Sequence, residues 1–100
     1  MTAQDVVELT RMLVARDTIN PPGNELRCAS LLAGMLEDGG FAVELTSFGE
    51  GRANLVARRG GIEGAKPICF TGHLDTVPLG SEAWSADPFG GEVADGKIYG

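Results

Sequence analysis

The stretch Pro67-Ile-Cys-Phe-Thr-Gly-His73-Leu-Asp75-Thr-Val-Pro78 is the part of this 100-residue chain on which its fold and chemistry depend. Residues 67–71 form a continuous apolar run, which predicts a buried strand with hydrophobic side chains on both faces. Gly72 ends the run, and the only histidine of the chain follows, two residues before an aspartate. A strand that delivers His73 and Asp75 together at its exit is typical of one half of a metal site.

The spacing of His73 and Asp75 places both side chains on one side of the chain. In an extended segment residues i and i+2 point the same way, so we expect the two to project together. A metal-bound imidazole usually donates its other ring N–H to a carboxylate or a carbonyl, and Asp75 is placed for that role. The spacing is also common by chance. For a bare His-x-Asp pair the favoured interpretation is an ordinary hydrogen-bonded histidine beside an exposed carboxylate.

The composition indicates a globular chain with at most one small domain. Hydrophobic residues make up 43% of the sequence and charged residues 22%, unlike the composition of disordered chains. A chain of this size buries about 60–65% of the surface of its unfolded state and is marginally stable. The net charge is −6, with both signs interspersed. This balance argues against nucleic acid and against an anionic membrane as partners.

The sequence favours a cytoplasmic location. Charged residues interrupt every apolar stretch near the N-terminus, which is unlike a secretory signal. No apolar run approaches the ~20 residues that a membrane-spanning helix needs. Cys28 and Cys69 have no C-x-x-C spacing, so we expect both to be reduced residues of the core.

Helical periodicity predicts two helices in the first part of the chain. Thr2 is expected to cap the first helix, which should end near Asp17, because the prolines of Asn20-Pro-Pro-Gly-Asn-Glu25 cannot continue it. Asn24 is expected to cap the second helix, and Gly39-Gly40 to end it. The buried stripe of the second helix is expected to consist of Cys28, Leu32, Met35 and Leu36.

After Gly40 the hydrophobic period changes to two, which predicts strands. Residues 41–46 and 53–57 are expected to pair across the turn at residues 49–51. Residues 67–71 then form a third strand, in the centre of the sheet.

The last part of the chain combines a loop with a hairpin. Residues 79–91 are rich in Gly, Pro, Ser and Asp and contain the only tryptophan, Trp84, which could line a substrate channel or pack locally. Residues 92–99 predict a hairpin with Asp95-Gly96 at a two-residue turn. The expected fold class is therefore α/β, with two helices followed by a mixed β-sheet and a C-terminal hairpin.

These motifs resemble those of one known family. Gly72-His-Leu-Asp-Thr-Val-Pro78, Trp84-Ser-Ala-Asp-Pro-Phe89 and Asp95-Gly-Lys-Ile-Tyr-Gly100 follow one another as in the co-catalytic zinc aminoacylase and carboxypeptidase family, of the acetylornithine deacetylase and succinyl-diaminopimelate desuccinylase type. The segment Asn20-Pro-Pro-Gly-Asn-Glu25 is also similar to that family's pattern. The resemblance covers nearly the whole chain, and it implies that residues 1–100 are the N-terminal part of a zinc-exopeptidase-like catalytic domain.

The resemblance also implies roles for the two site residues. His73 matches the family's first zinc ligand, and Asp75 matches the aspartate paired with it, to which we assign a catalytic role. Members of the family hydrolyse the amide of a small N-acyl amino acid with two zinc ions and a glutamate that takes a proton from water. Cobalt or manganese could replace zinc at such ligands. The family's dimer contacts lie in its lid domain, so a homodimer is compatible with the full-length form.

In the family the remaining parts of the site come after the position of Gly100. They include the aspartate that bridges both zinc ions, the general-base glutamate, further ligands and the lid and dimerisation domain. The acids of the loop and hairpin do not match ligand positions: Glu82, Asp87, Glu92 and Asp95. Because even open catalytic zinc sites use three protein ligands, His73 alone cannot hold zinc tightly. We therefore expect the 100-residue chain itself to be inactive.

The sequence leaves three functions open. The first is the N-terminal part of a dinuclear zinc hydrolase of N-acyl amino acids. The second is a non-catalytic fragment or module. The third is a mononuclear metal hydrolase whose site is completed across a dimer interface.

Overall fold

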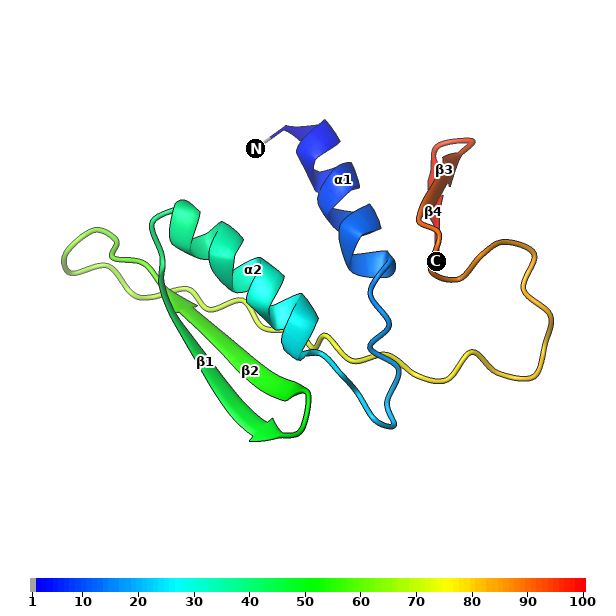
Figure 1. Ribbon diagram of the computed structural model, residues 1–100. Helices are drawn as coiled ribbons and strands as arrows, with labels where there is room; N and C mark the ends of the chain where they lie inside the picture. Colours follow the sequence, from blue (N-terminus) through cyan, green and yellow to red (C-terminus); the bar gives the residue numbers. More distant parts are fainter. Residues whose placement is uncertain (1) are drawn as a thin grey trace.

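A computed structural model of the chain describes residues 2–100. Its elements follow in the order α1 (Ala3–Val14), α2 (Leu26–Asp38), β1 (Ala42–Gly49), β2 (Arg52–Arg58), β3 (Glu92–Ala94) and β4 (Lys97–Tyr99) (Figure 1). The predicted α/β class is confirmed. No helix within residues 2–100 is long and apolar enough to cross a bilayer.

Helix α1 begins with the predicted cap. The Thr2 hydroxyl accepts a hydrogen bond from the Asp5 N–H at 3.2 Å, and the Asp5 carboxylate accepts one from the Thr2 N–H, which together form a capping box. The bond from the Thr2 backbone, with a second from its hydroxyl, lowers the pKa of the Asp5 carboxyl. The helix ends at Val14 and not near Asp17. The Asp17 carboxylate instead accepts from the Ile19 N–H at 3.1 Å, which favours a turn over further helix.

The prediction that Asn24 caps α2 is wrong. Asn24 has a φ of 52°, in the left-handed region, and it immediately precedes the true N-cap, Glu25. Glu25 makes no side-chain capping bond, because its carboxylate accepts from Arg52 at 2.8 Å. The N–H of Leu26 donates instead to the Gly51 carbonyl at 2.9 Å. A carbonyl in the turn of the β-hairpin therefore accepts the hydrogen bond of the first backbone N–H of the helix.

The C-terminal end of α2 is at the predicted glycine pair. Gly40 has a φ of 87°, which a residue with a Cβ adopts only with strain. The N–H groups of Gly40 and Phe41 donate to the carbonyls of Glu37 and Leu36 at 2.9 and 3.0 Å. This is a Schellman turn, which satisfies the last carbonyls of the helix and directs the chain into β1.

Strands β1 and β2 form the predicted antiparallel hairpin. The register pairs Ala42 with Arg58 and Thr46 with Asn54, and it shifts between Ser47 and Gly49. Helix α2 lies along this hairpin (Figure 1), so the two elements form the layered part of the structure.

Small residues make the contact between α2 and the hairpin. The buried apolar side chains are Cys28, Ala29 and Ala33 of α2 and Ala53 of β2. Of the predicted stripe, Cys28 is buried, Leu32 and Leu36 are half-buried, and Met35 is exposed. The alanines carry little weight in a hydrophobic periodicity, but they allow the helix to lie close to the strands.

The two cysteines have different surroundings. Both are free, as expected, but only Cys28 is buried, and the prediction of a buried Cys69 is wrong. Burial raises the pKa of the Cys28 thiol, and the charge of Arg16 opposes this effect.

The predicted central strand at residues 67–71 does not form. The described sheets are two separate antiparallel pairs, β1–β2 and β3–β4, and not one mixed sheet. Ile68 and Phe70 are 81% and 93% exposed. The chain makes one parallel bridge further on, between Ile19 and Thr76. A strand that is apolar on both faces needs neighbours on both edges and cover on both faces, and the described part of the chain supplies neither.

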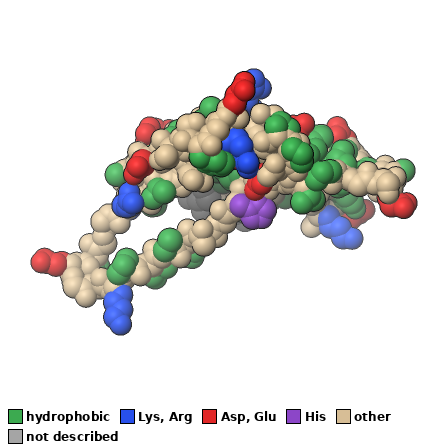
Figure 2. All heavy atoms as spheres, turned by 90° about the horizontal axis from the view of Figure 1, so that it is seen from below, with side chains coloured by type: hydrophobic (Ala, Val, Ile, Leu, Met, Phe, Trp, Pro, Cys, Tyr) green, Lys and Arg blue, Asp and Glu red, His purple; other side chains and the backbone are tan. Residues whose placement is uncertain are grey.

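The described chain is more extended than a closed domain of its length. Its Cα radius of gyration is 15.8 Å, against ~13 Å for a compact domain of this size. Residues 59–73 are all exposed, and Figure 2 shows part of the chain separated from the rest by an open gap. The apolar surface of residues 67–71 is therefore left without a layer to cover it.

The C-terminal hairpin forms as predicted. Strands β3 and β4 pair antiparallel, and Asp95 and Gly96 have φ values of 52° and 73°, as a type I′ turn requires. The hairpin is tied to α1 by the Nε of Arg11, which donates to the Gly91 carbonyl at 2.8 Å.

The loop at residues 79–91 has neither helix nor strand. Trp84 donates from its indole N–H to the Leu79 carbonyl at 3.0 Å, so its polar group is satisfied within the loop.

The Schellman turn predicts opposite outcomes for two glycine substitutions. Gly40→Ala should lower the free energy of unfolding by about 1–2 kcal/mol, because a Cβ is strained in the left-handed region. Gly34→Ala is the matched control, since it lies inside α2 with nothing within 4 Å of an added Cβ. It should raise the free energy of unfolding by about 0.5–1 kcal/mol. Urea unfolding followed by circular dichroism measures both, and equal effects would contradict the turn geometry.

Candidate metal centre

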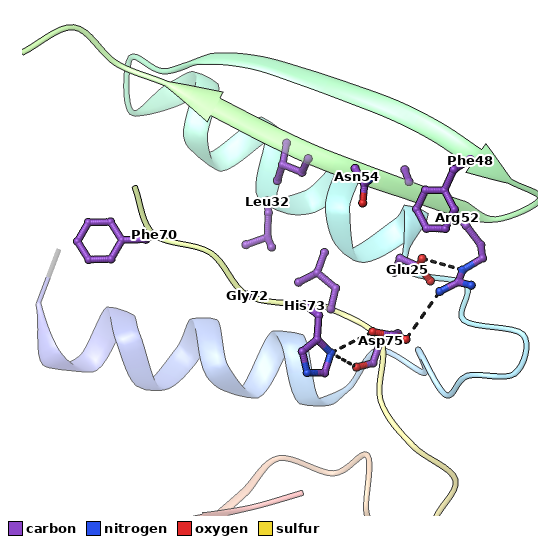
Figure 3. Close-up of a pocket in the computed structure, with 12 residues that line it drawn as sticks. Glu25, Leu32, Phe48, Arg52, Asn54, Phe70, Gly72, His73 and Asp75 are labelled. Carbon is purple, nitrogen blue, oxygen red and sulfur yellow. Dashed lines mark hydrogen bonds and ion pairs between the residues drawn. The ribbon is translucent and has the colours of Figure 1, made fainter. Parts of the chain in front are cut away.

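His73 and Asp75 lie together after the extended segment, as their spacing predicts (Figure 3). The Nδ1 of His73 is 2.8 Å from the Asp75 carbonyl oxygen and 3.0 Å from the carboxylate Oδ1. Both oxygens only accept, so Nδ1 carries the proton and donates. The Nε2 atom then keeps its lone pair in the neutral ring. In this tautomer Nε2 can bind a metal while Nδ1 donates to an oxygen.

The ring of His73 is open to solvent, and the aspartate behind it is half-buried. The side chain of His73 is 84% exposed and that of Asp75 is 30% exposed. The hydrogen bond to the Asp75 side chain, followed by the bond to its backbone, raises the pKa of His73. The pKa of Asp75 is lowered, first by the hydrogen bond from Asn20 and then by the bond from His73. Asp75 therefore remains a carboxylate beside the ring.

The second carboxylate oxygen of Asp75 is held from another side. The amide nitrogen of Asn20 donates to Oδ2 at 2.9 Å. The Nη2 atom of Arg52 lies 3.7 Å from the same oxygen, as the dashed line in Figure 3 marks. The two oxygens of Asp75 thus have different partners. Oδ1 contacts His73, whereas Oδ2 accepts a hydrogen bond from Asn20 and forms an ion pair with Arg52 of β2.

Arg52 is itself fixed by a buried partner. Its Nε donates to Glu25 Oε1 at 2.8 Å, and Glu25 is only 4% exposed. The guanidinium also lies over the Phe48 ring, 4.9 Å from its centre. A Cβ on Gly23 would come within 2.6 Å of Glu25 Oε2 and 2.7 Å of Arg52 Nε, so the pair needs a residue without a side chain there.

Backbone contacts align the turn before α2 with the His-Asp segment. The Asn20 N–H donates to the Thr76 carbonyl at 2.8 Å, and the Thr76 N–H donates to the Thr18 carbonyl at 3.0 Å. The hydroxyl of Thr18, which is 3% exposed, donates to the Leu74 carbonyl at 2.8 Å. These bonds bring Asn20 to Asp75 across 55 residues of sequence.

His73 and Asp75 border an open cavity of about 460 Å³. Its other lining residues include Leu32, Phe48, Arg52 and Phe70. A second cavity of about 420 Å³ also includes His73 and is lined by Trp84. The first volume is within the range of small-molecule sites. Trp84 therefore borders a space next to the site as well as packing in its own loop.

A single imidazole backed by a carboxylate fits the first ligand position of a zinc site. No group of three or more His, Cys, Asp or Glu residues that could hold a metal ion occurs in the part of the chain that the structure describes. The described residues therefore fit one part of a metal centre, and further ligands are needed to complete it.

Three residues around Asp75 had no functional role in the sequence interpretation. In the sequence Asn20 and Glu25 flank the prolines that end the first helix and belong to a segment that resembles the family's pattern, and nothing in the sequence distinguishes Arg52. The available signal was a pair of polar residues flanking Pro-Pro-Gly, a rigid turn that holds both ends in place. The sequence could not indicate that Asp75 lies beside this turn.

Curated relatives with one shared name match almost the whole chain. Succinyl-diaminopimelate desuccinylase of Xanthomonas oryzae pv. oryzae is 43% identical over 97 residues, which are 96% of this chain and 24% of the relative. Succinyl-diaminopimelate desuccinylase 1 of Ruegeria sp. is 42% identical over 101 residues, 100% of this chain and 26% of the relative. The Acinetobacter baumannii protein named succinyl-diaminopimelate desuccinylase is 40% identical, with the same coverage. The chain thus spans about a quarter of the length of these relatives. No family model and no solved structure matches it.

The contact between the two site residues predicts how His73 titrates. As the only histidine, it gives a single imidazole signal in nuclear magnetic resonance spectra. Its pKa should lie above 6.5, the ordinary value. Asp75→Asn should lower this pKa, because the carboxylate charge is lost. Asp87→Asn is the control, since the Asp87 carboxylate accepts from the Phe89 N–H instead. An unchanged pKa in Asp75→Asn would contradict the contact.

The same contact predicts a pH dependence of stability. Because folding raises the pKa of His73, its protonated form stabilises the folded state. That contribution is fully present below the unfolded pKa and is lost as the pH rises through the folded pKa. Urea unfolding at a series of pH values measures this contribution. As the pH rises, the free energy of unfolding should fall less in Asp75→Asn than in the unsubstituted chain. Identical pH profiles of the two proteins would contradict the contact between His73 and the Asp75 carboxylate.

Proposed function

Since this chain belongs to the succinyl-diaminopimelate desuccinylase family of hydrolases and matches its N-terminal portion, we propose that it contributes a ligand to a dinuclear zinc site. His73 is the ligand, through Nε2, and Asp75 is the carboxylate behind it. The site hydrolyses the amide bond of an N-acyl amino acid, which yields a carboxylate and an amine.

The orientation of the His73 ring is the observation that carries this proposal. Its Nδ1 is within hydrogen-bond distance of both the carbonyl oxygen and the carboxylate of Asp75, which leaves the lone pair on Nε2. The residue itself lines an open cavity. A carboxylate on the far nitrogen fixes the tautomer and raises the basicity of the ligand. Among residues 2–100 no other imidazole exists to take this position.

The chemistry of the bound metal is activation of water and polarisation of the scissile carbonyl. The residues of this chain support it in two ways. His73 presents a neutral nitrogen, which suits zinc and also cobalt or manganese. Asp75, whose pKa is lowered by Asn20 and His73, keeps its negative charge at neutral pH and can take up part of the positive charge that reaches the ring.

The substrate that we propose is an N-succinylated amino acid of the diaminopimelate type. The names of the relatives support it. N-acetylornithine is the second candidate, because acetylornithine deacetylases share the same motif pattern. We expect the enzyme to act in the cytoplasm, which the two free cysteines support. A homodimer formed through parts beyond this segment is part of the same proposal.

We also propose that the 100-residue segment is inactive by itself. One imidazole is offered to the metal, and the described residues contain no cluster of three ligands. Calorimetric titration of the segment with zinc should give a dissociation constant weaker than micromolar. Assays with N-succinyl-diaminopimelate and N-acetylornithine should show no turnover. Micromolar or tighter binding together with turnover would contradict this expectation and favour a site completed between two copies.

In the complete enzyme, substitutions at the two site residues should have graded effects. Asp75→Asn should lower zinc affinity and kcat/KM by about 10–100-fold, the range for carboxylates behind a ligand. His73→Ala should cost more, because the ligand itself is removed. Glu82→Gln is the control and should leave both unchanged. Metal analysis and kinetics on N-succinyl-diaminopimelate measure these effects. Unchanged zinc content and activity in His73→Ala would exclude the proposed role.

A further inference from the structure

The Asp75 carboxylate faces His73 with one oxygen and two foreign donors with the other. We propose that Asn20 and Arg52 are positioning residues for this carboxylate. They set its rotation and, through it, the tautomer of the His73 ring, and Glu25 holds Arg52 in place for this task. The inference rests on the proposed function, because the purpose of the arrangement is to present Nε2 to a metal.

The rotation of a free carboxylate is poorly defined. The last torsion of an aspartate joins an sp³ to an sp² carbon and has a broad energy profile. In Asp75, Oδ2 accepts a hydrogen bond from the amide of Asn20 at 2.9 Å and forms an ion pair with the Nη2 of Arg52 at 3.7 Å. With Oδ2 held, Oδ1 remains at 3.0 Å from the His73 ring nitrogen. Asn20 and Arg52 therefore restrict the torsion on which the contact between the Asp75 carboxylate and His73 depends. The contact of Nδ1 with the Asp75 carbonyl at 2.8 Å adds to it.

Arg52 can hold its Nη2 atom toward Asp75 because its guanidinium is rigid. The group is planar, so a fixed Nε also fixes the direction of Nη2. Glu25 binds Nε at 2.8 Å, and the Phe48 ring lies against the guanidinium at 4.9 Å. A lysine at this position would present one ammonium group and could not hold both carboxylates in the same geometry.

Glu25 is placed to anchor Arg52. It stands at the N-cap of α2 but makes no capping bond, and a buried carboxylate is costly unless it is paired. Its Oε2 has no hydrogen-bond partner among the described residues. Arg52 thus supplies the charge that this buried acid requires. Successive contacts thus connect Glu25 to Arg52, Arg52 to Asp75, and Asp75 to His73.

A purely structural role for these residues would not explain all of their contacts. The Glu25–Arg52 pair alone would link the start of α2 to β2. Such a link requires neither the ion pair of Arg52 with Asp75 Oδ2 nor the hydrogen bond of Asn20 to the same oxygen. The two roles differ in one observable, which is the tautomer of His73.

The first test uses the nitrogen chemical shifts of the His73 ring in the metal-free chain, above the pKa of the ring. The unsubstituted chain should show the Nδ1–H tautomer. Asn20→Ala and Arg52→Gln should each increase the population of the Nε2–H tautomer, and the double variant should increase it further. Arg58→Gln is the control, because Arg58 is also on β2 and pairs at the surface with Glu44 at 3.6 Å. It should leave the tautomer unchanged.

The second test measures zinc affinity in the complete enzyme by competition with a chelating dye. Asn20→Ala and Arg52→Gln should each weaken zinc binding by roughly tenfold, the lower end for residues behind a ligand. Arg58→Gln should stay within about twofold. If Arg52→Gln fails to fold, Asn20→Ala still decides, because the backbone N–H of Asn20 keeps its bond to the Thr76 carbonyl.

The outcomes separate this inference from the proposed function. Folded Asn20→Ala and Arg52→Gln variants with the tautomer and zinc affinity of the unsubstituted protein would overturn the positioning role, even if the enzyme hydrolyses its substrate. A tautomer shift in both variants would support the positioning role. That readout needs no metal, so it holds even if the complete enzyme proves to have another activity.

Discussion

The carboxylate of Asp75 is the contact on which the organisation of the site depends. It contacts the His73 ring and also Asn20 of the turn before α2 and Arg52 of β2. These three parts of the chain are far apart in sequence. Because an ionised carboxylate can accept several hydrogen bonds at once, one aspartate can join them and still orient an imidazole. The exposed His73 ring is therefore held through Nδ1, while Nε2 keeps its lone pair.

Local patterns predicted the elements that local interactions stabilise. The cap at Thr2, the glycine pair after α2, the hairpin of β1 and β2 and the Asp95-Gly96 turn all follow from contacts within a few residues. The pairing of His73 with Asp75 was predictable for the same reason. The contacts of Asn20 and Arg52 with Asp75 Oδ2 were not, because both join distant parts of the sequence, separated by 55 positions in the case of Asn20. Asn24 was misassigned because the backbone there turns left-handed and the cap moves to Glu25.

The failed prediction of a strand at residues 67–71 has a different cause. The pattern indicated a strand that is buried on both faces, and such a strand is stable only when others complete the sheet around it. The structure shows the same residues extended and exposed, with Phe70 at 93%. Both observations agree with a segment whose neighbours belong to the remainder of a longer protein, since the relatives are about four times the length matched here. The proposed zinc site would share this property, because the described residues offer it one imidazole and no cluster of three ligands.

Anomalous diffraction from crystals of the complete enzyme, recorded at the zinc edge, tests the central claim most directly. The account predicts a zinc peak within bonding distance of His73 Nε2, at ~2.0–2.1 Å. Asp75 Oδ1 should accept a hydrogen bond from Nδ1 of the same ring, and Asn20 and Arg52 should contact Asp75 Oδ2. A zinc peak away from His73, or zinc bound through Nδ1 with Asp75 turned aside, would contradict it.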